Sequence, residues 1–284
     1  MSRNRRVLGM LVSAPTTTKM FPGERMACIP DVIFARRVSV RIYGLGAVAL
    51  GLVGLVWGDY AVVWQPQPDS APGQTALGYA AAVPFLLAGL AIQWQRAAYF
   101  SALALTVFFS LGSAFLDVPR VVAHPSVFGT WEEAAEQLAL LAGGLVAYTY
   151  CAQLKPATAE LLSKIGRLLF GMCLIVFGLA HFFYLDYTAK LVPAWLPPGQ
   201  HFWVYATAAG FFAAGTATLS GIAARLAAML LTAMFVVFGI LVHAPTIFFH
   251  PHVHFNWAEN AVNFALIGSA WVIAASVPIG KSTA

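Results

Sequence analysis

Eight apolar stretches, each about as long as a membrane is thick, dominate the sequence. A helix that crosses the hydrocarbon core of a bilayer needs roughly 17–25 apolar residues. Stretches of this kind cover residues 42–58, 76–94, 97–116, 134–152, 168–185, 203–220, 224–243 and 258–277. Only 10% of all residues are charged, whereas a soluble domain has about 25%. The sequence therefore predicts an all-α membrane protein with eight transmembrane helices.

The charged residues predict which ends of these helices face the cytoplasm. If the N-terminus lies inside, the inner segments hold fourteen basic and three acidic residues, a net charge of +11. The outer segments hold eight acidic residues and two basic ones, Arg120 and Lys190, a net charge of −6. Because basic residues favour cytoplasmic loops, we expect both termini to lie inside. The basic residues then flank a lipid bilayer and do not indicate nucleic-acid binding.

Two segments that lie 126 residues apart share an unusual motif, P-x-x-x-x-H-P-x-V-x-x-x-W-x-E-x-A. Its scarce residue types are Pro119, His124, Pro125, Trp131 and Glu133 in the first copy, and Pro245, His250, Pro251, Trp257 and Glu259 in the second. Common hydrophobicity does not explain matches of such residue types, so the motif indicates an internal duplication.

The duplication predicts two four-helix membrane units, residues 41–152 and 167–277. Four helices bring the chain back to the side where it started, so the two units are expected to be parallel rather than inverted. A cytoplasmic linker, residues 153–166, joins the units. A poorly ordered basic tail, residues 1–40, precedes them, and a short cytoplasmic tail, residues 278–284, follows them.

The repeated motif has a structural and a functional interpretation. In the structural one, the first proline ends the third helix of each unit, and His-Pro forms an extended turn. The tryptophan then anchors the chain at the membrane boundary, and the glutamate starts the last helix. In the functional one, the histidine and the glutamate form a wet polar site at the outer rim. The residues of the motif leave both interpretations open.

The second unit has more polar residues inside its predicted spans than the first. It has His181 and His243 where the first unit has Gly54 and Asp117. Counted at 1.5 Å per residue from the inner face, both histidines lie in the outer half of the bilayer, near the level of Glu259. An ionisable residue within a span is a candidate for function. The alternative is that these histidines only bond to neighbouring helices.

These positions define the candidate site residues. His181, His243 and Glu259 are the catalytic candidates. His181, Asn260 and Asn263 are the candidates for binding a cofactor, for which a quinone is considered. His250, His252 and His254 alternate with apolar residues and would share one side of an extended chain. No cysteine or acid completes a metal-ligand set beside them, so no metal site is predicted.

Several short segments of the second unit follow one another in a distinctive order: Arg167–Gly171, Gly178–Phe182, Leu191–Pro197 (LVPAWLP), Ala224–Ala228 and Trp257–Asn260. In this order and spacing they resemble the DoxX-like family of bacterial membrane proteins. The resemblance implies a four-helix unit in a bacterial inner membrane and a link to quinone-dependent sulfur oxidation or thiol-redox complexes. The first unit departs from the pattern, with Pro66 and Pro68 in place of the LVPAWLP block.

Three functions agree with these features. The first is an auxiliary subunit of a quinone- or thiol-linked process, in effect an oxidoreductase subunit with a membrane or periplasmic redox partner. The second is a small-solute carrier or channel built from parallel repeats. The third is a structural membrane subunit without chemistry of its own.

Overall fold

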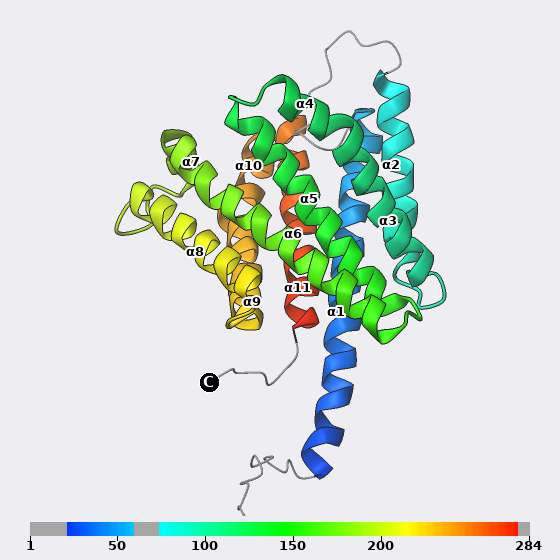
Figure 1. The fold of residues 1–284 in the computed structure, drawn as a ribbon. Helices are drawn as coiled ribbons and strands as arrows, with labels where there is room; N and C mark the ends of the chain where they lie inside the picture. Colours follow the sequence, from blue (N-terminus) through cyan, green and yellow to red (C-terminus); the bar gives the residue numbers. More distant parts are fainter. Residues whose placement is uncertain (1–21, 60–73, 278–284) are drawn as a thin grey trace, which may run out of the picture.

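The computed structural model describes residues 22–59 and 74–277, and these residues are almost entirely helical (Figure 1). The first half contains α1 (Pro22–Trp57), α2 (Gln74–Ala91), α3 (Ala98–Gly112), the π-helical segment η1 (Ser113–Asp117), α4 (Val118–Ala123) and α5 (Phe128–Cys151). The second half contains α6 (Pro156–Phe183), α7 (Leu185–Leu191), α8 (Gln200–Ser220), α9 (Ala224–Phe238), the π-helical segment η2 (Gly239–His243), α10 (Ala244–Phe249) and α11 (His254–Ser276). Since the described residues contain no strand, the predicted all-α class is confirmed.

Six helical stretches of the described chain are long and apolar enough to cross a membrane. They are Ile33–Trp57, Ala98–Ala123, Pro156–Phe183, Gln200–Ser220, Ala224–Phe249 and His254–Ser276. The other two predicted spans correspond to α2, which is apolar but shorter, and α5, which has three glutamates near its start. Large apolar side chains such as Phe115 and Phe248 stay 73% and 83% exposed, as a lipid-facing surface requires. The molecule is a multi-pass membrane protein, and the number of eight spans stays a prediction.

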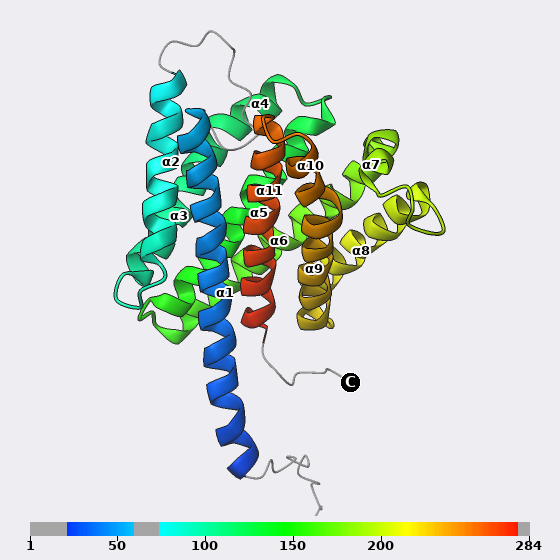
Figure 2. The same cartoon turned by 180° about the vertical axis from the view of Figure 1, so that it is seen from behind.

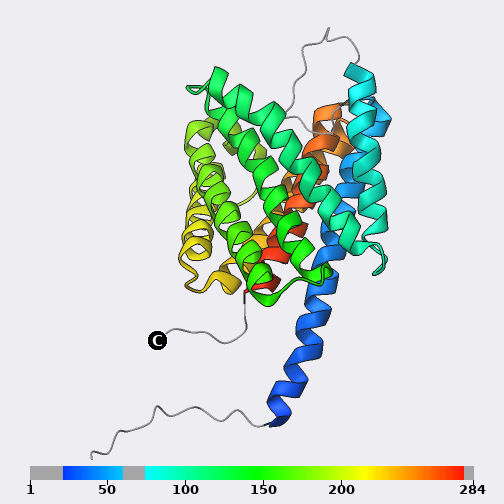
Figure 3. The ribbon, with the colours of Figure 1, turned by 45° about the vertical axis from the view of Figure 1, so that its right-hand side comes forward.

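Helix α1 is much longer than the first predicted span. It begins at Pro22, whereas that span begins at residue 42, so part of the predicted basic tail is helical. In Figure 1 its first turns extend beyond the rest of the bundle. The start of α1 and the end of α11 lie at the same end of the molecule (Figure 3). Residues 1–21 and 278–284 of the predicted tails lie outside the described residues.

The third helix of each predicted unit does not end at its proline. Pro119 lies in the first turn of α4 and Pro245 in the first turn of α10, and the helical path continues to Ala123 and Phe249. The prediction that these prolines end their helices is therefore wrong. A proline ring clashes with the carbonyl group four residues earlier in a regular α-helix. The wider π turn directly before each proline makes room for the ring, so the helix continues.

Helix α11 lies in the middle of the bundle, beside α1 and α5 (Figures 1 and 2). The first helix of the chain therefore packs against the last. A Cβ atom at Gly46 would come within 2.4 Å of the Cα atom of Ala265, and one at Gly268 within 2.5 Å of the Cα atom of Tyr43. These distances leave no room for a side chain, so glycine permits the close approach of α1 and α11.

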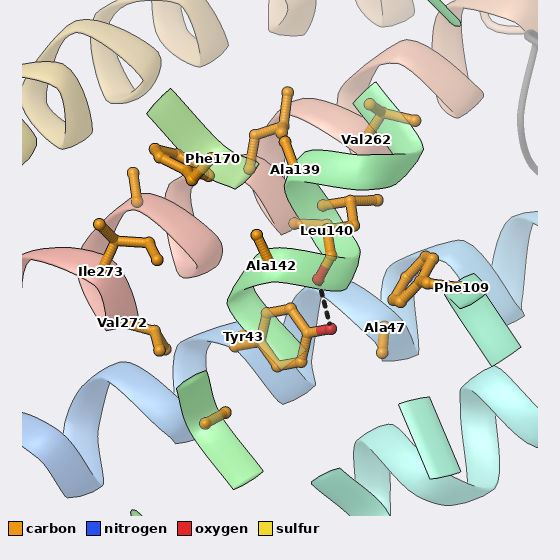
Figure 4. Packing of buried hydrophobic residues seen from close by; sticks show 14 of the residues in the cluster. Tyr43, Ala47, Phe109, Ala139, Leu140, Ala142, Phe170, Val262, Val272 and Ile273 are labelled. Atoms are coloured by element: carbon orange, nitrogen blue, oxygen red, sulfur yellow. Dashed lines mark hydrogen bonds between the residues drawn. The ribbon is translucent and has the colours of Figure 1, made fainter. Parts of the chain in front are cut away.

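Large buried side chains fill the space around this contact (Figure 4). Tyr43, Phe109 and Phe170 come from α1, α3 and α6, and each is at most 1% exposed. The hydroxyl group of Tyr43 donates a hydrogen bond of 2.9 Å to the backbone oxygen of Leu140 in α5. This bond satisfies a polar atom that water does not reach. The core therefore connects helices from both halves of the chain.

A methyl group at Gly268 is expected to destabilise the protein. In Gly268→Ala the new atom would lie 2.5 Å from a backbone atom of Tyr43, so α1 and α11 must move apart. We expect a loss of about 1–3 kcal/mol, typical of overpacked cores, seen as a lower melting temperature in detergent. Gly210→Ala is the control, because its new atom would meet only the flexible side chain of Met234, at 3.3 Å. Equal melting temperatures for the two variants would contradict this account of the packing.

Candidate functional site

A cavity of about 520 Å³ lies between α5 and the helices of the second half. Its wall is formed by the first turns of α5 and α11, the last turns of α6, the middle of α8, and the stretch from α9 through η2 into α10, together with α7. The short helices α7 and α10 lie at the end of the bundle opposite the start of α1 (Figures 1 and 2). We call this space the main cavity. Its volume is in the range of small-molecule binding sites.

Five of the predicted site residues line the main cavity. They are Glu133 from α5, His181 from α6, His243 from η2, and Glu259 and Asn263 from α11. Asn260 is not among the lining residues. Its side-chain nitrogen donates hydrogen bonds to the backbone oxygen atoms of His243, at 2.7 Å, and Asn256, at 2.8 Å. Asn260 therefore connects α11 to the end of η2.

The ring of His181 is held in one orientation. Its Nδ1 atom lies 2.8 Å from the backbone oxygen of Phe177, one turn earlier in α6. Because a carbonyl oxygen only accepts, Nδ1 carries the hydrogen, and Nε2 of the neutral ring is an acceptor. The ring also packs against Phe211, with 5.3 Å between the centroids. No group in the described part of the chain forms a hydrogen bond with Nε2.

Other polar side chains of the wall also donate to the backbone. The Nδ2 atom of Asn263 lies 3.1 Å from the backbone oxygen of Phe235, and Nδ2 of Asn256 bonds to two backbone oxygens at 3.2 Å. The hydroxyl groups of Thr207 and Thr246 bond to carbonyl oxygens of their own helical turns, at 2.8 and 2.7 Å. The donors of Asn256, Thr207 and Thr246 and one of the two N–H donors of Asn263 are thus engaged, and the acceptor atoms of these side chains remain available for a ligand.

The main cavity carries an excess of acidic groups. Glu132, Glu133 and Glu136 of α5 and Glu259 of α11 line it, and no lysine or arginine is among the described residues of its wall. Arg120 of α4 reaches one of these glutamates, with 2.8 Å between its Nη1 atom and Oε2 of Glu133. Glu132 and Glu259 form no ion pair with any described residue.

Equivalent side chains of the repeated motif and its surroundings have different ionic and hydrogen-bonding partners in the two halves. Arg120 follows the first proline in one copy, whereas Thr246 follows it in the other. Glu259 therefore has a hydroxyl group at the position where Glu133 has a guanidinium. Farther inside, Asp117 accepts a hydrogen bond of 3.0 Å from Gln137, and both are 2% exposed. In the second half, the matching residues are His243 and Asn263 of the main cavity.

The remaining residues of the motif shape the turn before α5 and α11. The indole nitrogen of Trp131 donates to the backbone oxygen of Pro125, at 3.0 Å, and that of Trp257 donates to the backbone oxygen of Pro251, at 2.8 Å. The side chains of His124 and His250 are exposed and do not line the main cavity. The motif thus contributes its two glutamates to the cavity, whereas its His-Pro pairs and the tryptophans that bond to them shape the turn.

The three alternating histidines do not gather into a metal site. His250 and His252 are exposed, and the ring of His254 stacks on Trp57, with 5.2 Å between the centroids. Among the described residues, no group of three or more His, Cys, Asp or Glu is placed to hold a metal ion.

Two glutamates and two tyrosines of the wall are absent from the candidates predicted from the sequence. Glu132 and Glu136 stand four residues apart, a spacing that places both on one helix face and could have marked them. Tyr184 directly precedes α7, and Tyr187 lies within it. This short helix has no clear apolar pattern. Although 54% of Tyr187 is exposed, burial raises the pKa of its hydroxyl, and the carboxyl of Glu259 raises it further. This hydroxyl therefore stays protonated and is a donor in the wall that Glu259 also lines.

Comparison with known families identifies part of this site. Residues 162–244 match the model of the DoxX family, which confirms the resemblance found in the sequence. The matched segment contributes His181 and His243, whereas α5 and α11, which carry the four glutamates, lie outside it. No curated protein and no solved structure matches the chain at a significant level.

Exchange of Arg120 for glutamine is expected to destabilise the protein. It leaves the carboxylate of Glu133 without its cation, and the two side chains are only 30% and 26% exposed. We expect a cost of about 1 kcal/mol, because solvent still screens the pair in part, measured as a lower melting temperature in detergent. The double variant Arg120→Gln/Glu133→Gln should regain part of this loss, since it also removes the carboxylate that lost its partner. A double variant no more stable than Arg120→Gln would show that the carboxylate of Glu133 without Arg120 costs no stability.

Proposed function

We propose that this membrane protein with a DoxX domain binds a small amphipathic molecule in its main cavity. One observation carries the proposal: histidines from α6 and η2 and glutamates from α5 and α11 surround a single space of about 520 Å³. Protein interiors are normally close-packed, so a space of this size is not explained by packing. Its combination of apolar walls and a few polar groups is typical of ligand sites.

We also propose that the cavity lies between two parallel four-helix units of an eight-span protein. In support, α3, η1, α4 and α5 begin 126 residues before α9, η2, α10 and α11, respectively. The packing of α5 against α6 has its counterpart in the packing of α11 against α1, as expected for an axis along the membrane normal. The charge distribution supports an orientation with both termini in the cytoplasm and the cavity in the outer half, and the resemblance to the DoxX family supports a bacterial inner membrane.

Among the three hypotheses from the sequence, the small-solute carrier agrees best with this cavity. Substrate sites of many transporters lie where two repeats meet, and here α5 of the first unit faces the helices of the second. Four glutamates suit a polar or charged solute. A quinone fits less well, because its carbonyl oxygens need donors and most polar side chains of the wall donate to the backbone.

One observation favours a redox role as a second candidate. Oxidation of a quinol releases two electrons and two protons, and His181 Nε2 and the Glu259 carboxylate are proton acceptors in one cavity. The electrons would pass to a separate redox partner protein. The test is to replace His181, His243 and Glu259 individually by alanine and to measure quinone-dependent reductase activity in membranes. We expect at least a tenfold loss if this role is correct, and unchanged rates at normal protein levels would eliminate it.

Filling the main cavity tests the binding proposal directly. In Thr207→Phe the ring occupies space in the cavity wall, whereas Thr216→Phe places the same ring on the exposed side of α8. Isothermal titration of the protein in lipid nanodiscs, with 2-phenylethylamine, 2-phenylethanol and decylubiquinol as probes, reports binding. We expect Thr207→Phe to weaken the binding of at least one probe about tenfold or more, and Thr216→Phe to match the natural protein. Identical titrations for all three proteins would contradict the proposal.

A further inference from the structure

We propose that the ligand of the main cavity is a small organic cation that carries N–H donors, such as an ammonium or amidinium group on an apolar ring or chain. This inference rests on the proposed binding function and names the ligand class for the same site. It follows from the charge of the wall, the hydrogen-bonding atoms that the wall leaves unused, and the aromatic rings around them.

The wall lacks a cation that its carboxyl groups require. Of the four glutamates, Glu133 is paired with Arg120, whereas Glu132 and Glu259 have no ion pair within the described residues. A carboxyl group that is partly removed from water stays ionised at low cost only with a partner of opposite charge or with several donors, and otherwise tends to take up a proton. The hydroxyl of Tyr187, which lines the same cavity, supplies a donor but no charge. A bound cation would neutralise this acidic excess.

The first half of the chain shows the arrangement that a bound cation would complete in the second. There, the guanidinium of Arg120 lies 2.8 Å from Glu133, and Gln137 bonds to Asp117 at 3.0 Å. At the equivalent positions of the second half, Thr246 replaces Arg120, and His243 and Asn263 replace Asp117 and Gln137. These residues and Glu259 line the main cavity. The ligand's cationic group would bind Glu259 as Arg120 binds Glu133.

The unused polar atoms of the wall point to a ligand that donates hydrogen bonds. Asn263 is 5% exposed and lines the main cavity, and its hydrogen bond to Phe235 uses its nitrogen, which leaves its side-chain oxygen free to accept. A donor on a ligand in the cavity could bond to this oxygen. His181 Nε2 is a second acceptor in the same wall. An ammonium or amidinium group has several N–H donors and can bond to both kinds of acceptor.

The size and apolar lining of the cavity favour an organic cation over a metal ion. Five phenylalanine rings line it: Phe177, Phe211, Phe235, Phe238 and Phe255. Phe211 lies within 5.7 Å of Phe177 and Phe235, measured between ring centroids. Aromatic faces attract cations and also accommodate an apolar ring or chain. The described residues hold no metal-ligand set, and about 520 Å³ far exceeds the space of a bare ion.

The ligand class is tested with three probes of similar shape. They are 2-phenylethylammonium, the neutral 2-phenylethanol, and trimethyl(2-phenylethyl)ammonium, which has a charge but no N–H group. Titrations use the full chain in nanodiscs of zwitterionic lipid, so that the membrane itself does not attract cations. We expect the primary ammonium to bind at least about tenfold more tightly than the alcohol, as charge-assisted hydrogen bonds predict, and more tightly than the trimethyl compound.

Two substitutions should remove the preference for 2-phenylethylammonium over 2-phenylethanol, one by removing a carboxylate and the other by supplying a cation. Glu259→Gln removes a carboxylate of the wall while keeping its shape. Thr246→Arg keeps every carboxylate and supplies Glu259 with the arginine that Glu133 has in the first half. Each should weaken the binding of 2-phenylethylammonium about tenfold, and Glu259→Gln, which keeps the size of the side chain, should weaken the binding of 2-phenylethanol much less. Asp186→Asn is the control, because Asp186 is an exposed acid of α7 outside the main cavity and should not affect either probe.

The outcomes separate this inference from the binding proposal. If 2-phenylethanol binds as tightly as the ammonium, or Glu259→Gln binds the ammonium as well as the natural protein does, the cation class is wrong and the binding site remains. If the trimethyl compound binds as tightly as the primary ammonium, the requirement for N–H donors is wrong. If Thr207→Phe leaves the binding of all probes unchanged, the binding function itself fails. Glu259→Gln decides the question even if Thr246→Arg does not fold.

Discussion

The close approach of α11 to α1 and α5 is the contact on which the rest of the structure depends. In a membrane, lipid chains are as apolar as leucine, so helices associate through close packing that small residues allow. Gly46 and Gly268 bring α11 against α1, and a Cβ atom at Gly143 of α5 would lie 2.4 Å from Ser269 of α11. The same helix carries Glu259 and Asn263 in its first turns. The backbone contacts in the middle of the bundle therefore fix the position of one wall of the main cavity.

The apolar stretches predicted the helices well because a membrane leaves the backbone few alternatives. Inside lipid, each N–H and C=O group must find a partner within the protein, so an apolar stretch of sufficient length forms a helix. The span predicted from residue 224 begins where α9 begins. The start of α1 at Pro22 was not predictable in this way, because hydropathy marks the part of a helix that lies in lipid and not its continuation into water. Nor does hydropathy reveal that a π turn accommodates Pro119 and Pro245.

Part of the cavity lining was predictable from how deep each polar residue lies in the membrane. His181 and His243, counted from the basic residues Arg167 and Arg225 at the inner face, lie in the outer half of the bilayer near the level of Glu259, and residues at one level of a bundle can meet. Depth does not tell which way a side chain turns, so Asn260, which bonds to the backbone of η2, was not distinguishable from Asn263, which lines the cavity. Glu132 and Glu136 were missed because acidic residues are common in the first turns of helices and therefore carry little information there.

The segment η2 has a consequence for how one helix can serve the cavity along its length. A π turn contains more residues than an α turn, so the helix beyond it is rotated about its axis. Phe235 and Phe238 before η2 and Thr246 after it nevertheless line the same wall. Without one residue of Gly239–His243, a regular α-helix would turn Thr246 by about 100°. The π segment thus rotates the helix by the amount that keeps the side chains before and after Pro245 on the face that lines the main cavity.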